Sequence, residues 1–97
     1  MNKARLDKLR RELREIRKNP AGRRASELEA YAKLVGRTLD KRGKEPNWVK
    51  EDDPVLTPPL SIPHHSKDMK LGTVRSIVDQ LLDDIDSWEQ FLVDENE

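Results

Sequence analysis

The first regular pattern in the chain is a narrow apolar stripe near its N-terminus. It consists of Leu6, Leu9, Leu13 and Ile16. The spacings of three, four and three residues place these side chains on one face of a helix, while the other faces are charged. Asn19-Pro20 and Gly22 then end the helix. Because the stripe has so few members, we expect this helix to pack on one edge of another element or on a partner.

A second helix is predicted to begin at Ser26. Ser26 and Glu29 have the S-x-x-E spacing of a capping box, in which each side chain bonds the backbone N–H of the other residue. The expected buried face is made of Leu28, Tyr31, Ala32 and Val35. Gly36 follows at the position where a glycine commonly closes a helix.

The strongest pattern in the chain lies near its C-terminus. Gly72-Thr73 is predicted to open a long helix with Thr73 as its N-cap. A broad stripe follows, made of Val74, Ile77, Val78, Leu81, Leu82, Ile85, Trp88 and Leu92. This breadth predicts the central core helix, and residues 94–97 are expected to fray.

Three short strands are predicted between the second and the last helix. They cover residues 38–39, 47–50 and 55–62, with turns at Gly43 and at residues 51–54. Pro58 and Pro59 cannot donate to a ladder, so the third strand is expected to be an edge or a bulged entry, paired through residues 60–62. Short strands suit an antiparallel sheet with one face covered by helices. The order is therefore ααβββα, an α+β fold.

Length and composition allow one modest core. The chain has 97 residues, of which 34% are hydrophobic and 39% charged, with no cysteine. This excludes disulfides, thiolate metal sites and a cysteine nucleophile. No apolar run approaches the roughly 20 residues that span a bilayer, and no apolar segment follows the basic N-terminus as in a secretory signal. We therefore expect a cytoplasmic protein without a membrane partner.

The formal net charge of zero hides a strong asymmetry. Residues 1–24 carry ten Lys and Arg against three acids, whereas residues 74–97 carry eight acids against Arg75 alone. A basic segment of this kind can bind nucleic acid. Equally, the two oppositely charged ends can dock on each other. The sequence leaves both readings open, and a third is that the outer cations are only a solvated surface.

The segment from Leu60 to Ile77 resembles the hallmark of the HicA family of small RNA-targeting toxins. The matching positions are Pro63, His65, Lys70, Gly72, Thr73, Ser76 and Ile77, without a gap. Upstream, similar features are Asn19-Pro20, Ser26-Glu27-Leu28, Gly36 and the Arg42-Gly43 turn. The resemblance covers roughly residues 19 to 88, and its most specific part is about eighteen residues long.

The resemblance implies a fold like that of a double-stranded-RNA-binding domain, αβββα, with an additional N-terminal helix. The corresponding domain organisation is a basic amphipathic helix over residues 1–18, a HicA-like domain over residues 19–92 and a disordered tail over residues 93–97. Members of the family are mRNA interferases, the toxins of toxin–antitoxin systems. The resemblance therefore implies RNA as a target and an antitoxin-like protein as a partner.

The family's catalytic position differs in this chain. In the family, Gly-Ser-His follows the Arg-Gly turn, and that histidine is the presumed catalytic residue. Here Lys44 replaces the serine, and the histidine position falls on Glu45. A carboxylate is a poor proton donor at neutral pH unless its pKa is raised, and Arg42 and Lys44 favour its charged form. The resemblance thus implies RNA binding with weakened or lost cleavage.

His65 is the remaining catalytic candidate, because imidazole can give and take protons near neutral pH. A positioning contact or a structural loop role are the alternatives for this residue. The candidate RNA-binding residues are Lys41, Arg42, Lys44, Lys67, Lys70, Thr73 and Arg75. Together they could frame a phosphate-binding surface, since duplex RNA is recognised largely through backbone contacts. The alternative is a solvated charged rim.

No cofactor is predicted, and no metal site is assigned. His64 and His65 are adjacent and would point opposite ways on an extended chain; a carboxylate site at Asp52 and Asp53 is conceivable but has no further sequence support. Trp48 and Trp88 are expected in the core, with base stacking by Trp48 as an alternative. The functional prediction is a HicA-like RNA-binding protein. The alternative is a protein-interaction module that docks through its N-terminal helix and has no nucleic-acid role.

Overall fold

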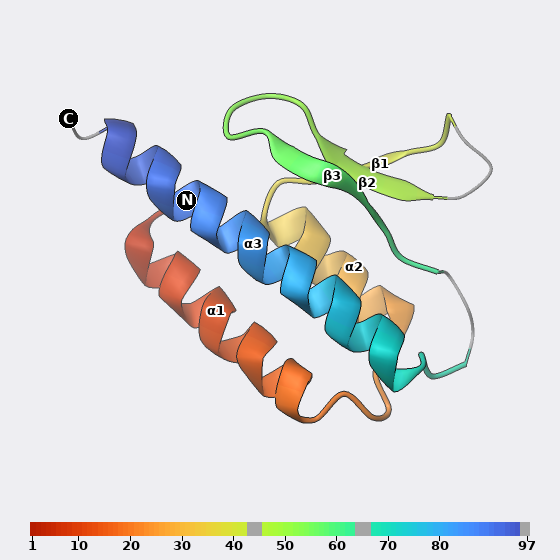
Figure 1. Ribbon diagram of the computed structural model, residues 1–97. Coiled ribbons are helices and arrows are strands. Elements are labelled where there is room, and N and C mark those ends of the chain that lie inside the picture. Colours follow the sequence, from red (N-terminus) through yellow and green to blue (C-terminus); the bar gives the residue numbers. More distant parts are fainter. Residues whose placement is uncertain (43–45, 64–66, 96–97) are drawn as a thin grey trace.

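The computed structural model describes residues 1–42, 46–63 and 67–95. It contains, in chain order, the elements α1 (Lys3–Lys18), α2 (Ala25–Leu34), β1 (Thr38–Asp40), β2 (Asn47–Lys50), β3 (Leu56–Ser61) and α3 (Leu71–Glu95). The predicted order of helices and strands is therefore confirmed, and the protein has an α+β fold (Figure 1).

The three strands form one antiparallel sheet in the order β1-β2-β3. Trp48 is the central residue of the ladder, opposite Leu39 on one side and Leu60 on the other. The register between β2 and β3 then shifts, so that Lys50 pairs with Leu56. This irregularity falls where Pro58 and Pro59 interrupt β3, as expected for residues that have no N–H to donate.

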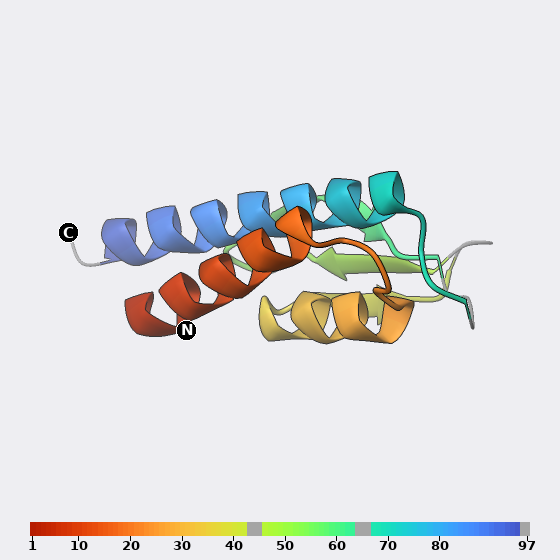
Figure 2. The ribbon, with the colours of Figure 1, turned by 90° about the horizontal axis from the view of Figure 1, so that it is seen from below.

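Both α2 and α3 pack on the same face of the sheet. Trp48 and Lys50 project from that face of β2; Lys33 of α2 lies over the Trp48 ring, and Lys50 lies under Trp88 of α3. The helix α1 packs along α3 on the side away from the sheet, so the molecule has three layers (Figures 1 and 2). One apolar core runs through all of them.

The apolar stripe of α1 is buried inside this core. Its members Leu6, Leu9, Leu13 and Ile16 are each at most 4% exposed. Arg10 and Arg17 flank the stripe and form ion pairs with acids of α3. The reading in which the basic and acidic ends dock on each other is thus confirmed for this flank of α1. The stripe itself is used within the chain and is not open to a partner.

Two predicted helix starts are wrong. The helix α2 begins at Ala25 with Arg24 at the N-cap, so Ser26 lies in the first turn and does not cap it. The helix α3 begins at Leu71, so Thr73 lies inside its first turn rather than at the N-cap. In both places the helix begins before the residue that offers a capping side chain. A buried apolar residue anchors each start, Ala25 in α2 and Met69 just before α3.

The helix ends are closer to expectation. Gly36 has a φ of +97°, and the N–H groups of Gly36 and Arg37 bond the carbonyls of Lys33 and Ala32. This is the Schellman arrangement, which confirms the predicted glycine closure. The end of α3 differs from the expected tail, because residues 93–95 are helical. Residues 96–97 lie outside the described part of the chain. No helix in the described ranges is long and apolar enough to cross a membrane.

Candidate nucleic-acid interface

The segments that carry the predicted RNA-binding residues lie at one end of the molecule. The end of β1 and the segment that leads into α3 both reach this end, where α2 and α3 also begin (Figures 1 and 2). Two segments that are far apart in the sequence are therefore brought to the same end of the fold. We call this the loop end.

Four predicted cations at the loop end are exposed and have no ionic partner among the described residues. They are Lys41, Lys67, Lys70 and Arg75. An exposed, unpaired ammonium or guanidinium can bind a phosphate without first breaking a contact within the protein. These four residues are therefore the available part of the predicted surface.

Arg42 differs from these four because it is already paired. Its Nε and backbone N–H bond Asp40 Oδ1 at 3.0 and 2.9 Å, and its Nη2 lies 2.9 Å from Asp40 Oδ2. These hydrogen bonds hold the pKa of Asp40 below its ordinary value. The guanidinium remains 80% exposed, so it can add a contact to a phosphate, but part of its charge is neutralised locally.

The segment before α3 is fixed to the linker that follows α1. The Met69 N–H donates to the Arg23 carbonyl at 2.9 Å, and the Met69 side chain is buried. Arg24 Nε lies 3.6 Å from Asp68 Oδ1. Lys67 and Lys70 flank this anchor on both sides, so the structure holds their backbone in place while their side chains remain exposed.

The remaining predicted site residues contribute less or cannot be placed. Thr73 is half-buried in the first turn of α3, which limits its contact with a ligand. His65, Lys44 and Glu45 lie outside the described residues.

The sequence interpretation missed a buried ion pair at the centre of the helix–sheet contact. Arg37 and Asp84 are 1% and 2% exposed. Burial raises the pKa of Asp84, while the hydrogen bonds from Arg37 act in the opposite direction. A signal was present in the sequence, since Asp84 falls on the apolar stripe of α3 between Leu81 and Ile85. The pair is structural, because no ligand can reach it.

A second buried cation lies beside it. Lys50 is 8% exposed, and its Nζ donates to the carbonyls of Asp52 and Pro54 at 2.8 and 3.1 Å. The ammonium also lies 5.1 Å from the centroid of the Trp88 ring, a cation–π geometry. Trp48 is 4% exposed. Its ring is therefore part of the core, as predicted, and the base-stacking alternative is wrong.

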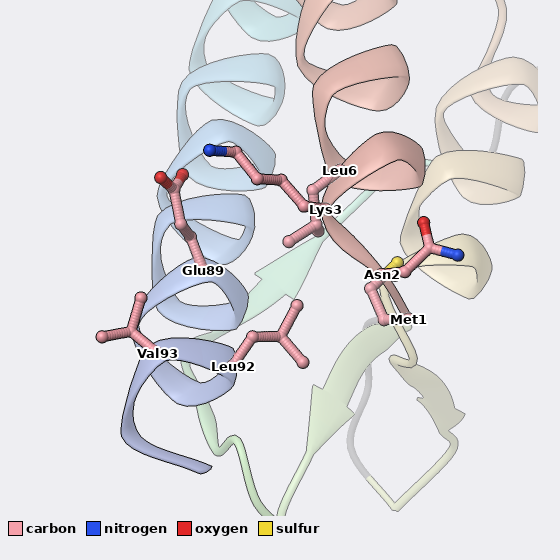
Figure 3. A pocket seen from close by; sticks show the side chains of 7 residues that line it. All are labelled: Met1, Asn2, Lys3, Leu6, Glu89, Leu92 and Val93. Carbon is pink, nitrogen blue, oxygen red and sulfur yellow. The ribbon is translucent and has the colours of Figure 1, made fainter. Parts of the chain in front are cut away.

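The opposite end of the molecule has a shallow groove between α1 and α3 (Figure 3). Its volume is about 300 Å³, and it is lined by Met1, Asn2, Lys3, Leu6, Glu89, Leu92 and Val93. The floor is apolar, and Lys3 and Glu89 form the rim. The lining has no histidine, and its single carboxylate, Glu89, is paired with Arg10. None of the predicted site residues lies here.

No metal centre emerges from the described ranges. Within residues 1–42, 46–63 and 67–95, no group of three or more His, Asp or Glu side chains could hold a metal ion. Comparison with known proteins gave no match among family models, curated proteins or solved structures. The geometry that remains is a compact scaffold with exposed cations.

Proposed function

We propose that this protein binds structured RNA through the phosphate backbone, using the exposed cations at the loop end. The observation that carries the proposal is that two segments reach this end, the one after β1 with Lys41 and the one that leads into α3 with Lys67, Lys70 and Arg75. None of these four cations has an ionic partner among the described residues. Backbone contacts of this kind require charge and shape and no base readout.

The arrangement of the scaffold supports the same proposal. Two helices on one face of a three-stranded antiparallel sheet, in the order α2-β1-β2-β3-α3, are what the likeness to a double-stranded-RNA-binding domain requires. The HicA-like segment from Pro63 to Ile77 adds the support of sequence. We therefore propose a HicA-like RNA-binding protein, with an antitoxin-like protein as the partner that would cover the loop end.

RNA affinity and its salt dependence test this proposal. A duplex RNA of about 16 base pairs, the length that one such domain spans, would be titrated with the protein at several salt concentrations. We expect the logarithm of the association constant to fall linearly with the logarithm of the salt concentration. The loop-end variant K41Q/K67Q/K70Q/R75Q should lower this slope by about three to four.

A charge-preserving variant provides the control. K41R/K67R/K70R/R75K keeps every positive charge and should retain the slope of the wild type. A wild-type protein that shows no salt-dependent affinity for the duplex would refute RNA binding. Incubation of a single-stranded RNA with the wild type and with His65→Ala would separately test cleavage. We expect little or no cleavage, because the position of the family's histidine is Glu45.

A further inference from the structure

Six of the eight basic residues of α1 fall into two groups with different surroundings. Arg10 and Arg17 face α3, where Arg10 bonds Asp86 and Glu89 and Arg17 bonds Asp79. The outward group consists of Lys8, Arg11, Arg14 and Lys18, which we call the α1 ridge. All four are exposed, and none has an ionic partner among the described residues. The docking of α1 onto α3 therefore accounts for only part of its charge.

The acids nearest to the ridge already have other partners. Asp7 lies 3.5 Å from Arg10, Glu12 accepts a hydrogen bond from Tyr31, and Glu15 accepts one from Asn19. Like charges three or four residues apart repel each other on a helix surface. The ridge residues are spaced by three, three and four, so their charges repel one another, and a polyanion bound along the ridge would offset that repulsion.

The ridge has the dimensions of a backbone contact. With a rise of about 1.5 Å per residue, Lys8 and Lys18 are separated by about 15 Å along the helix axis. One strand of a duplex such as DNA carries a phosphate about every 3.4 Å of axis. The ridge is thus as long as about four successive phosphates, and it holds four cations. Two of them are arginines, whose planar fork can bind two phosphate oxygens at once.

The same geometry argues against two other partners. A helix that binds a lipid surface inserts an apolar face, but the apolar face of α1 is buried against the core. A protein partner would need apolar anchors at the centre of its contact. The outward face of α1 around the ridge offers only Ala4. A polyanion without apolar groups, such as a nucleic-acid backbone, fits this face best.

We propose that the α1 ridge is a second nucleic-acid contact, which extends the RNA surface of the loop end along the outside of α1. This inference rests on the proposed RNA binding and deepens it. The linker after α1 connects the two surfaces, because the Arg23 carbonyl accepts the Met69 N–H at 2.9 Å. A duplex that contacts both surfaces is held by about twice as many cations as the loop end alone provides.

The test compares the ridge variant K8Q/R11Q/R14Q/K18Q with the charge-preserving variant K8R/R11K/R14K/K18R. The probe is the same RNA duplex of about 16 base pairs. The ridge variant should lower the salt slope by about three to four and weaken binding on the order of tenfold or more at low salt. The charge-preserving variant should retain the slope. Thermal unfolding of each variant verifies that α1 stays docked.

The outcomes separate this inference from the proposed function. If the ridge variant keeps the wild-type slope while the loop-end variant lowers it, the ridge is refuted and RNA binding at the loop end stands. If only the ridge variant lowers the slope, the ridge is supported and the loop-end surface is refuted. If the wild type shows no salt-dependent binding, both fail. If the ridge variant loses a binding to vesicles of anionic phospholipid that the wild type shows, while its RNA binding is unchanged, the ridge is assigned to a membrane surface and the inference is overturned.

Discussion

Arg37 and Asp84 form a two-pronged ion pair in the interior, although 47 positions separate them in the sequence. Arg37 Nε lies 2.7 Å from Asp84 Oδ2, and Arg37 Nη2 lies 2.8 Å from Asp84 Oδ1. The remaining nitrogen, Nη1, donates to the carbonyls of Trp48 and Pro58 at 2.7 and 3.2 Å. One guanidinium thus joins α3 to β2 and β3.

Removal of either charge should destabilise the protein strongly. Asp84→Asn leaves the Arg37 cation buried without its counter-charge, and Arg37→Met leaves the Asp84 carboxylate buried without a cation. Each should lower the free energy of unfolding by about 3–5 kcal/mol, as measured by urea denaturation. The double variant R37M/D84L removes both charges and should cost less than the sum of the single changes, because neither charge is left unpaired.

Two further results bear on this prediction. The double variant should still be less stable than the wild type, since the carbonyl of Trp48 loses the Arg37 donor and that of Pro58 keeps only the bond from Gln80. Arg42→Met, which breaks the exposed pair with Asp40, provides the control and should change stability little. Additive losses for Arg37 and Asp84 would mean that the two residues contribute independently.

The parts of the fold that could be predicted are those set by a repeated apolar pattern along the chain. The stripes of α1 and α3 are periodic, and their buried members could be read directly because burial of apolar surface dominates folding. The cap at Ser26 was predicted wrongly, since a capping box contributes only about 1 kcal/mol and the burial of Ala25 moves the start by one residue. Pro58 and Pro59 correctly placed the irregular part of β3.

The site was predictable only in part, for a similar reason. Exposure of Lys67, Lys70 and Arg75 follows from their charge. Ion pairing does not follow from the sequence, because the sequence allows Arg42 to pair with Asp40 or to bind a ligand equally well. Arg37 was least predictable, since an arginine next to a strand is usually solvated. Only the three-dimensional approach of α3 places a carboxylate beside it.

Gly36 should tolerate no side chain, for two separate reasons. Its φ of +97° is strained for any other residue. A Cβ would also lie 2.9 Å from Lys50 Cε, and Lys50 cannot easily move because its Nζ bonds the carbonyls of Asp52 and Pro54. Gly36→Ala should therefore lower the free energy of unfolding by more than the roughly 1–2 kcal/mol that the backbone strain alone would cost.

Gly22 provides a matched control for this substitution. It has a similar φ of +76°, but a Cβ there would meet nothing within 4 Å. Gly22→Ala should thus show the backbone strain alone. The difference between the two variants in urea denaturation measures the crowding at Lys50, and equal losses would show that Lys50 moves away freely.

The docking of α1 on α3 should weaken in acid. Hydrogen bonds and charge from Arg10 hold the pKa of Glu89 below its ordinary value. A carboxylate with a lowered pKa in the folded state contributes stability that is complete above its unfolded pKa, about 4.3. That contribution is lost as the pH falls through the lower, folded pKa. Stability should therefore decline below about pH 4.

The Glu89→Gln variant tests this assignment. Its stability should decline less between about pH 5 and pH 3 than that of the wild type, because it has no carboxylate to protonate at this position. Glu95→Gln is the control on the same helix, since Glu95 has no ionic partner among the described residues. A Glu89→Gln variant with the full wild-type decline would assign the acid sensitivity to other carboxylates.

Tyr31 reports the contact between α2 and α1. It is the chain's single tyrosine, and its hydroxyl donates to Glu12 Oε1 at 3.1 Å. Burial raises the pKa of Tyr31, and the negative charge of Glu12 raises it further, because the phenolate would be repelled. Titration by ultraviolet absorbance should therefore give a pKa above the ordinary value, and Glu12→Gln should lower it. Glu15 lies about one turn further along α1 and accepts a hydrogen bond from Asn19 instead, so Glu15→Gln should leave the pKa of Tyr31 unchanged. An equal effect of the two substitutions would show that α1 does not pack against α2 in this register.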